Sequence, residues 1–149
     1  MVVDSVRTNP HTQQHVVILK SEDQQTYLFI WIGSNEAYAI ATELQQLVYL
    51  RPLTHDLLKK IIEGTGLAVS EICITSVQED IFYAQIVLKR SEETLTFDAR
   101  PSDALALAVR TQAPVRVAPS ILESRGISQQ QLDEQLRFTQ AEKSPDEAP

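Results

Sequence analysis

Residues 15–33 read HVVILKSEDQQTYLFIWIG, which is two apolar runs separated by a short polar segment. The runs at 15–20 and 27–32 are rich in β-branched and aromatic residues and are apolar on both faces, as is typical of buried strands. The polar residues 21–25 between them predict an antiparallel hairpin in mid-sheet. Gly33 then ends the second strand, and the next residues can cap a helix. This stretch therefore predicts a sheet with helices packed against it.

Helical patterns recur along the rest of the chain. Apolar residues continue at helical spacing through 36–49, and Pro52 is expected to end that helix. A second helix is expected at 54–64 with Thr54 as its cap, and a third at 101–111, apolar on every side. Further strands are expected at residues 2–7, 67–77, 81–90, 94–98 and, as an edge strand, 115–117. The sequence predicts an α+β fold, a single compact domain whose mixed, largely antiparallel sheet is packed by three main helices.

The length of 149 residues fits one domain, which we assign to residues 1–127. Residues 128–149 are Gln-rich and acidic, and predict a weak amphipathic helix to 138 followed by disorder from 140. The single cysteine, Cys73, excludes an internal disulfide and a Cys-based zinc site, so a reducing cytoplasm is expected. We expect no membrane span and no signal peptide, because the sequence lacks an apolar run of the necessary length.

Charge limits the binding partners that the chain can be expected to hold. The 13 Lys and Arg against 20 Asp and Glu give a net charge of −7, without any basic run. Proteins that bind a phosphate backbone tightly usually present a basic patch. Binding of DNA or RNA is therefore expected to be weak unless a metal ion assists it.

Two polar clusters precede expected helices in the first half of the chain. Glu36 lies at a strand-to-helix junction, where it can act as a metal ligand or general base, or simply complement the helix dipole. Arg51, His55 and Asp56 bring three catalytic residue types into one turn. His55 and Asp56 can form a metal-ligand or acid–base pair; the alternative is a capped helix with an exposed His and a first-turn Asp.

A third cluster lies at the start of the apolar helix. Asp98 and Asp103 bracket Arg100, with Ser102 between Arg100 and Asp103. Two carboxylates near a helix N-terminus can hold Mg²⁺, and an arginine can bind phosphate through two hydrogen bonds. The structural alternative is an Asp–Arg pair in which Asp103 complements its own helix.

In this order, the clusters resemble the bifunctional nuclease domain family. The matching strings are YLFIWIG at 27–33 with Glu36 and Ala37, RPLTHDL at 51–57, FYA at 82–84 and DARPSDALAL at 98–107. The resemblance extends from about residue 2 to about residue 127. It implies a compact α+β domain with activity on both DNA and RNA.

Two functions from different classes remain open. The first is a nuclease, a hydrolase assisted by Mg²⁺ or Mn²⁺. Its candidate residues are His55, Asp56, Asp103 and Glu36 for catalysis, Arg51, Arg100 and Ser102 for phosphate binding, and Asp98 and Asp103 for the metal. The second is a non-enzymatic regulatory domain that binds a small anion or a protein.

Two expectations about surfaces follow from these patterns. The first function requires the helix starts at 54–56 and 100–103 to face one shared cleft, where free N–H groups favour anions. The apolar runs at 16–19 and 27–32 also offer more flat strand surface than three helices readily cover. A homo-oligomer is therefore expected.

Overall fold

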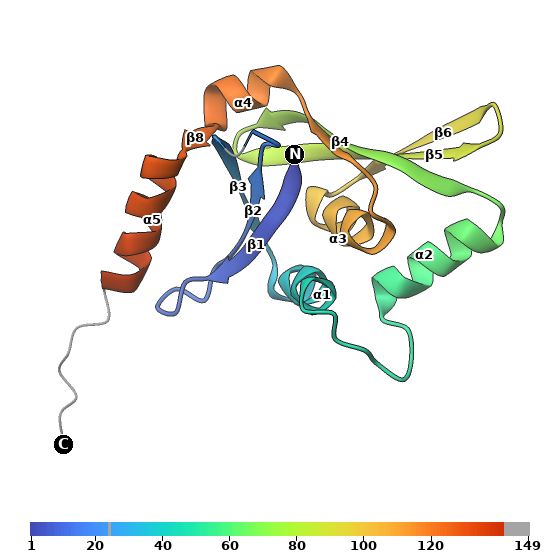
Figure 1. Ribbon diagram of the computed structural model, residues 1–149, viewed down its shortest axis with the longest axis horizontal. Helices are drawn as coiled ribbons and strands as arrows, with labels where there is room; N and C mark the ends of the chain where they lie inside the picture. Colours follow the sequence, from blue (N-terminus) through green and yellow to red (C-terminus); the bar gives the residue numbers. More distant parts are fainter. Residues whose placement is uncertain (24, 142–149) are drawn as a thin grey trace.

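The computed structural model describes residues 1–23 and 25–141, with side chains as far as Arg137. The described residues form eight strands and five helices, which confirms the α+β class (Figure 1). In chain order they are β1 (Val2–Thr8), β2 (His15–Lys20), β3 (Thr26–Ile32), α1 (Ser34–Leu44), α2 (Thr54–Gly64), β4 (Ala68–Gln78), β5 (Ile81–Arg90), β6 (Glu93–Ala99), α3 (Pro101–Thr111), β7 (Val115–Val117), α4 (Pro119–Arg125), β8 (Ile127–Ser128) and α5 (Gln129–Ala141).

The strands divide between two four-stranded sheets instead of forming one. The N-terminal sheet has the order β1-β2-β3-β8 and the central sheet the order β6-β5-β4-β7. All neighbours pair antiparallel except β4 and β7, which are parallel. Parallel neighbours need a long crossover, and here the chain between them includes α3. β7 pairs only with β4, so residues 115–117 form the edge strand that was predicted.

Helix α3 is the centre of the core. It lies against the central sheet between α1 and α2 (Figure 1). Leu105 and Leu107 are both 0% exposed, which confirms the burial predicted from a helix that is apolar on every side. Residues from both sheets pack into the same apolar cluster as this helix, among them Leu28 of β3 and Ile72 of β4.

Helix α5 covers part of the opposite face of the N-terminal sheet. Leu132 packs there against Val16, Ile18 and Tyr27, in a second small apolar cluster. The helix expected in the tail is therefore present, and it extends to Ala141, beyond the point where disorder was predicted to begin. Residues 142–149, the rest of that predicted disordered segment, lie outside the described residues.

Two local predictions were wrong. Helix α1 ends at Leu44 and not at residue 49, because Gln46 adopts a left-handed conformation with φ 55°. The N–H groups of Gln46 and Leu47 donate to the carbonyls of Glu43 and Thr42, a Schellman ending formed without the usual glycine. Consequently Val48 is 95% exposed instead of buried.

The cap of α2 also differs from the expected one. Thr54 is the first helical residue and Leu53 occupies the cap position. The Leu53 N–H donates to the Asp56 carboxylate at 2.9 Å, so the side chain that closes this helix start is an acid within the first turn.

Replacing Leu105 or Leu107 by Ala is expected to lower the free energy of unfolding by about 2–5 kcal/mol, because each leaves a cavity in a closed core. Urea denaturation measures the change. Leu50→Ala is the matched control, since Leu50 is fully exposed on the α1–α2 loop. Equal stability of all three variants would contradict the central placement of α3.

Candidate functional site

Three helices begin at one open hollow of about 540 Å³. Asn35 and Glu36 reach it from α1, Thr54 and His55 from α2, and Arg100 and Asp103 from the start of α3. The first N–H groups of a helix have no partner within the helix, and they carry the positive end of its dipole. Three such ends around one hollow make it a favourable place for an anion.

A chain of ion pairs joins the three helix starts. Arg100 donates from Nε to Asp103 Oδ2 at 2.9 Å and from Nη1 to Glu36 Oε1 at 3.0 Å. The other oxygen of Asp103 lies 2.9 Å from Nε2 of His55. The structure thus brings Glu36, His55, Arg100 and Asp103 together, although up to 67 positions separate them in the sequence.

Glycine at position 33 gives Glu36 its place in this chain. Gly33 is the residue before the first turn of α1, and its backbone is extended. A Cβ atom at this position would collide with the carboxylate of Glu36. The Gly33–Glu36 spacing therefore lets the acid fold back over the helix start and meet Arg100.

The charge state of Asp103 fixes the tautomer of His55. Burial raises the pKa of Asp103, but hydrogen bonds with His55 and Arg100 outweigh burial and hold it below its ordinary value. An ionised carboxylate can only accept, so the proton between the two groups belongs to His55 Nε2. In the neutral ring, Nδ1 is then free to take a proton. The His55 side chain is 12% exposed, which leaves it accessible from the hollow.

Asp56 does not share this environment, although it was predicted to act beside His55. Its Oδ1 accepts from Arg110 Nε at 2.7 Å, and the side chain of Arg110 is only 3% exposed. Burial raises the pKa of Asp56, but the hydrogen bonds from Arg110 and Leu53 outweigh it and the net shift is downward. Asp56 therefore ties α2 to the buried helix α3.

Three other candidate residues also lie outside the hollow. Asp98 is exposed on β6, where it is paired with Gln85, whereas the neighbouring Ala99 is paired with the buried Ala84. Successive residues of a strand face opposite sides, so Asp98 points away from the core side. Arg51 is exposed on the loop before α2, and Ser102 is buried in the first turn of α3.

The predicted metal site is not formed by these residues. Within residues 1–23 and 25–141, no group of three or more His, Cys, Asp or Glu side chains could hold a metal ion. Both carboxylates at the hollow are already paired with Arg100. The guanidinium offsets the negative charge that a Mg²⁺ or Mn²⁺ ion was expected to offset.

One structural residue was missed in the sequence. Arg110 lies in a helix that is otherwise apolar, and a charged side chain that cannot leave a buried helix must be paired. That rule predicts an acidic partner for Arg110, and Asp56 is that partner.

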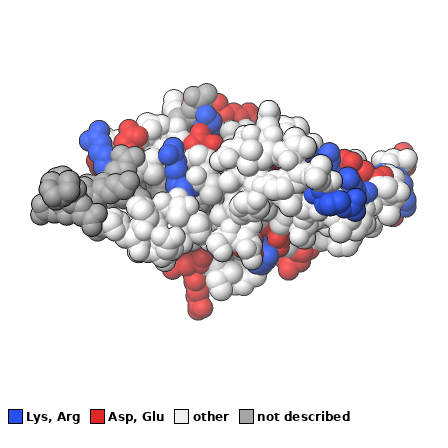
Figure 2. Space-filling model, turned by 90° about the horizontal axis from the view of Figure 1, so that it is seen from below, with Lys and Arg blue, Asp and Glu red and all other residues white. Residues whose placement is uncertain are grey.

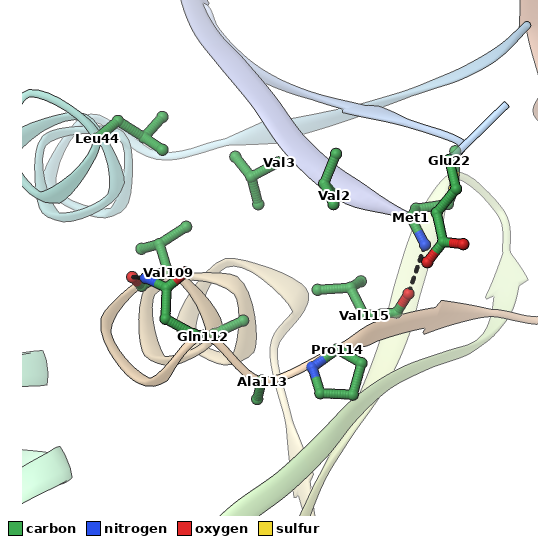
Figure 3. Close-up of a pocket in the computed structure, with 11 residues that line it drawn as sticks. Met1, Val2, Val3, Glu22, Leu44, Val109, Gln112, Ala113, Pro114 and Val115 are labelled. Atoms are coloured by element: carbon green, nitrogen blue, oxygen red, sulfur yellow. Dashed lines mark hydrogen bonds between the residues drawn. The ribbon is translucent and has the colours of Figure 1, made fainter. Parts of the chain in front are cut away.

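A different hollow, of about 280 Å³, separates β1 from the end of α3 and from β7 (Figure 3). Its lining is mainly apolar, and the Met1 amino group donates there to the Val115 carbonyl at 2.7 Å. The contact links the two sheets. This hollow contains Glu22 but no histidine or arginine, so it offers much less chemistry than the three helix starts.

No continuous basic strip crosses the face shown in Figure 2, where Lys and Arg occur in separate small groups. The positive field at the hollow therefore comes from helix ends and Arg100 instead of from an extended basic surface. No helix among the described residues is long and apolar enough to cross a membrane.

Comparison with known proteins adds independent information. A profile of the bifunctional nuclease domain matches residues 17–130, which include all three helix starts. An uncharacterized protein of Mycobacterium tuberculosis is 38% identical over 125 residues, covering 84% of this chain and 74% of that protein. Bifunctional nuclease 1 of Oryza sativa subsp. japonica is 26% identical over 156 residues, and Bifunctional nuclease 2 of Arabidopsis thaliana is 25% identical over 122. These alignments cover 97% and 79% of this chain, but only 47% and 36% of the plant proteins.

Asp56→Asn is expected to lower the free energy of unfolding by about 1–3 kcal/mol at neutral pH, because it weakens the partner of a buried arginine. The folded-state pKa of Asp56 lies below the ordinary value of 3.8. The stabilisation is therefore complete above that value and is lost as the pH falls through the lower, folded-state pKa. Urea denaturation should show a gap between variant and wild type that narrows below about pH 4.

The matched control is Asp80→Asn, which alters an exposed pair between Asp80 and Arg125. Exposed pairs contribute little, so its stability should stay close to that of the wild type. A gap for Asp56→Asn that is independent of pH would contradict the assigned ion pair.

Proposed function

The chain belongs to the bifunctional nuclease domain family, and we propose that it hydrolyses phosphodiester bonds of DNA and RNA at the hollow where α1, α2 and α3 begin. The observation that carries this proposal is the His55–Asp103 pair beside Arg100 at three helix starts. A potential base, a cation and helix dipoles are combined there in one open site.

Phosphate binding is assigned to Arg100 and the helix starts. Nε and Nη1 of Arg100 are held by Asp103 and Glu36, so Nη2 is left for a phosphate oxygen. The side chain is 65% exposed and can be reached by a bulky substrate. Free backbone N–H groups, including that of Ser102, add to the field. A local field of this kind can bind phosphate even though the chain as a whole is acidic.

The catalytic residue is His55. With Nε2 protonated toward Asp103, Nδ1 removes a proton from water or, in RNA, from the neighbouring 2′-hydroxyl. The resulting oxygen attacks phosphorus, and the bond from phosphorus to the leaving oxygen breaks. Asp103 stabilises the imidazolium formed, as the carboxylate does in a catalytic triad. Arg100 stabilises the added charge on the phosphoryl oxygens.

The other candidates take supporting roles or none. Glu36 is a positioning residue, because it holds Arg100. Arg51 is retained as a contact for a phosphate further along the strand, since it is exposed just before α2. Asp56 is assigned to structure, and Asp98 receives no role in the reaction. No step requires a metal ion, because the residues at the hollow do not form a three-ligand group.

A non-enzymatic anion-binding domain is the second candidate. It is favoured by one observation: both acids at the hollow are already neutralised by Arg100. A phosphate group could then rest on the helix starts without being attacked. This candidate predicts binding of nucleotides without any cleavage that depends on His55.

The deciding experiment measures cleavage of labelled single-stranded DNA and RNA by the purified chain, with and without EDTA. His55→Ala should lower the rate by about a hundredfold or more, because general-base catalysis contributes at least that much. Arg100→Ala should mainly raise KM. His11→Ala, in the turn between β1 and β2, is the matched control and should cleave at the wild-type rate.

Three results would count against this assignment. Equal rates for His55→Ala and the wild type would remove the catalytic role of His55. Loss of activity in EDTA would show that a metal ion takes part. Nucleotide binding by the wild type without cleavage would favour the second candidate.

A further inference from the structure

The outer face of the N-terminal sheet is only partly covered. Tyr27, Phe29 and Trp31 alternate along β3 and so share this face. Leu132 of α5 covers the end at Tyr27, which is buried. Trp31, at the other end, is 59% exposed. A large aromatic side chain left open beside a packed cluster suggests a binding surface.

A row of three residues crosses the sheet at this open end. Trp31 of β3 is paired with Val16 of β2, and Val16 is paired with Arg7 of β1. All three side chains therefore lie on the same face, with the cation and the indole on either side of Val16. We call Phe29, Trp31 and Arg7 the Trp31 platform.

Two hollows border the platform. One, of about 110 Å³, lies between Trp31, Arg7 and Asn9, and the other, of about 400 Å³, between Trp31, Phe82 and Arg125. Phe29 lines both. An aromatic face with arginine and amide groups around it is the composition that binds an unpaired nucleobase and its phosphate.

The charges at the platform favour an anionic partner. Arg7 is exposed and makes no ion pair or side-chain hydrogen bond with any described residue. Arg125, by contrast, is paired with Asp80 at 2.6 Å. The platform thus presents one unpaired cation next to an open indole ring.

We propose that Trp31 stacks on an unpaired base of the nucleic-acid strand while Arg7 binds an adjacent phosphate. The inference rests on the proposed function, because it places a second contact for the strand whose backbone is cut at His55. Trp31 and Glu36 are five residues apart, so at most about 18 Å of chain separates the platform from the hollow. One strand can reach both.

Stacking also resolves the charge problem of this chain. A net charge of −7 makes general attraction to a phosphate backbone unfavourable. Base stacking is independent of that charge and is largely indifferent to sequence, because every base has a π face. It therefore suits a protein that acts on both DNA and RNA.

Trp31 is the only tryptophan of the chain, so intrinsic fluorescence reports on the platform alone. The probe is a single-stranded oligothymidylate of about 12 nucleotides, a typical site size, with a phosphorothioate backbone that resists cleavage. The expected result is quenching of Trp31 emission by this strand, and much weaker quenching by a duplex of equal length.

Variants test the contact in the whole protein. Trp31→Leu should weaken binding, measured by anisotropy of a labelled strand, roughly five- to hundredfold. Arg7→Ala should weaken binding and reduce its salt dependence. The matched control is Tyr83→Leu, because Tyr83 is a partly exposed aromatic residue on β5 of the central sheet. It should bind like the wild type, and thermal melts should show all variants folded.

Unchanged binding by Trp31→Leu would overturn the proposal. So would light scattering that shows a wild-type dimer converted to a monomer by Trp31→Leu, with strand binding intact; the platform would then be an interface between two copies. Normal KM and cleavage by Trp31→Leu would refute the platform and leave the role of His55 standing. Trp31-dependent binding without cleavage by the wild type would support the platform and refute the proposed function.

Discussion

The burial of α3 is the constraint on which the rest of this structure depends. Leu105 and Leu107 exclude water from a helix that also carries Arg110, and both termini of that helix must be satisfied by neighbouring elements. Asp56 meets Arg110 on one side of α2, and His55 meets Asp103 on the other. Two adjacent residues of α2 therefore fix it to α3 at two points. The candidate site is the exposed one of these two contacts, so its geometry is held by the same packing that holds the core.

Charge at the site is local and differs in sign from the charge of the whole chain. The starts of α1, α2 and α3 converge on Arg100, and two carboxylates keep the guanidinium in place. A guanidinium stays charged throughout the physiological range, and it offers planar donors that match phosphate. An acidic domain can in this way keep one anion-seeking point without the long basic surface that would bind nucleic acid indiscriminately.

The sequence predicts the parts of this fold that depend on local pattern. The hairpin of β2 and β3 and the buried helix α3 follow from apolar runs, and both are present. The end of α1 could not be predicted, because Gln46 takes a conformation that usually marks glycine. The division into two sheets depends on long-range pairing, which periodicity does not encode. The site was predicted only in part for a related reason: successive helical residues point about 100° apart, so His55 and Asp56 face different neighbours.

The paired acids also determine how the site responds to pH. Hydrogen bonds with His55 and Arg100 outweigh burial and hold the pKa of Asp103 below its ordinary value, so this carboxylate remains ionised as the medium becomes mildly acidic. Arg100 does not titrate in that range either, since Asp103 and Glu36 raise its pKa further. The imidazole of His55 is then the group at the hollow whose charge can change near neutrality. Protonation at Nδ1 would remove the base while leaving the ion pairs that orient it intact. The cluster is thus arranged so that a single proton separates an active arrangement from an inactive one with the same geometry.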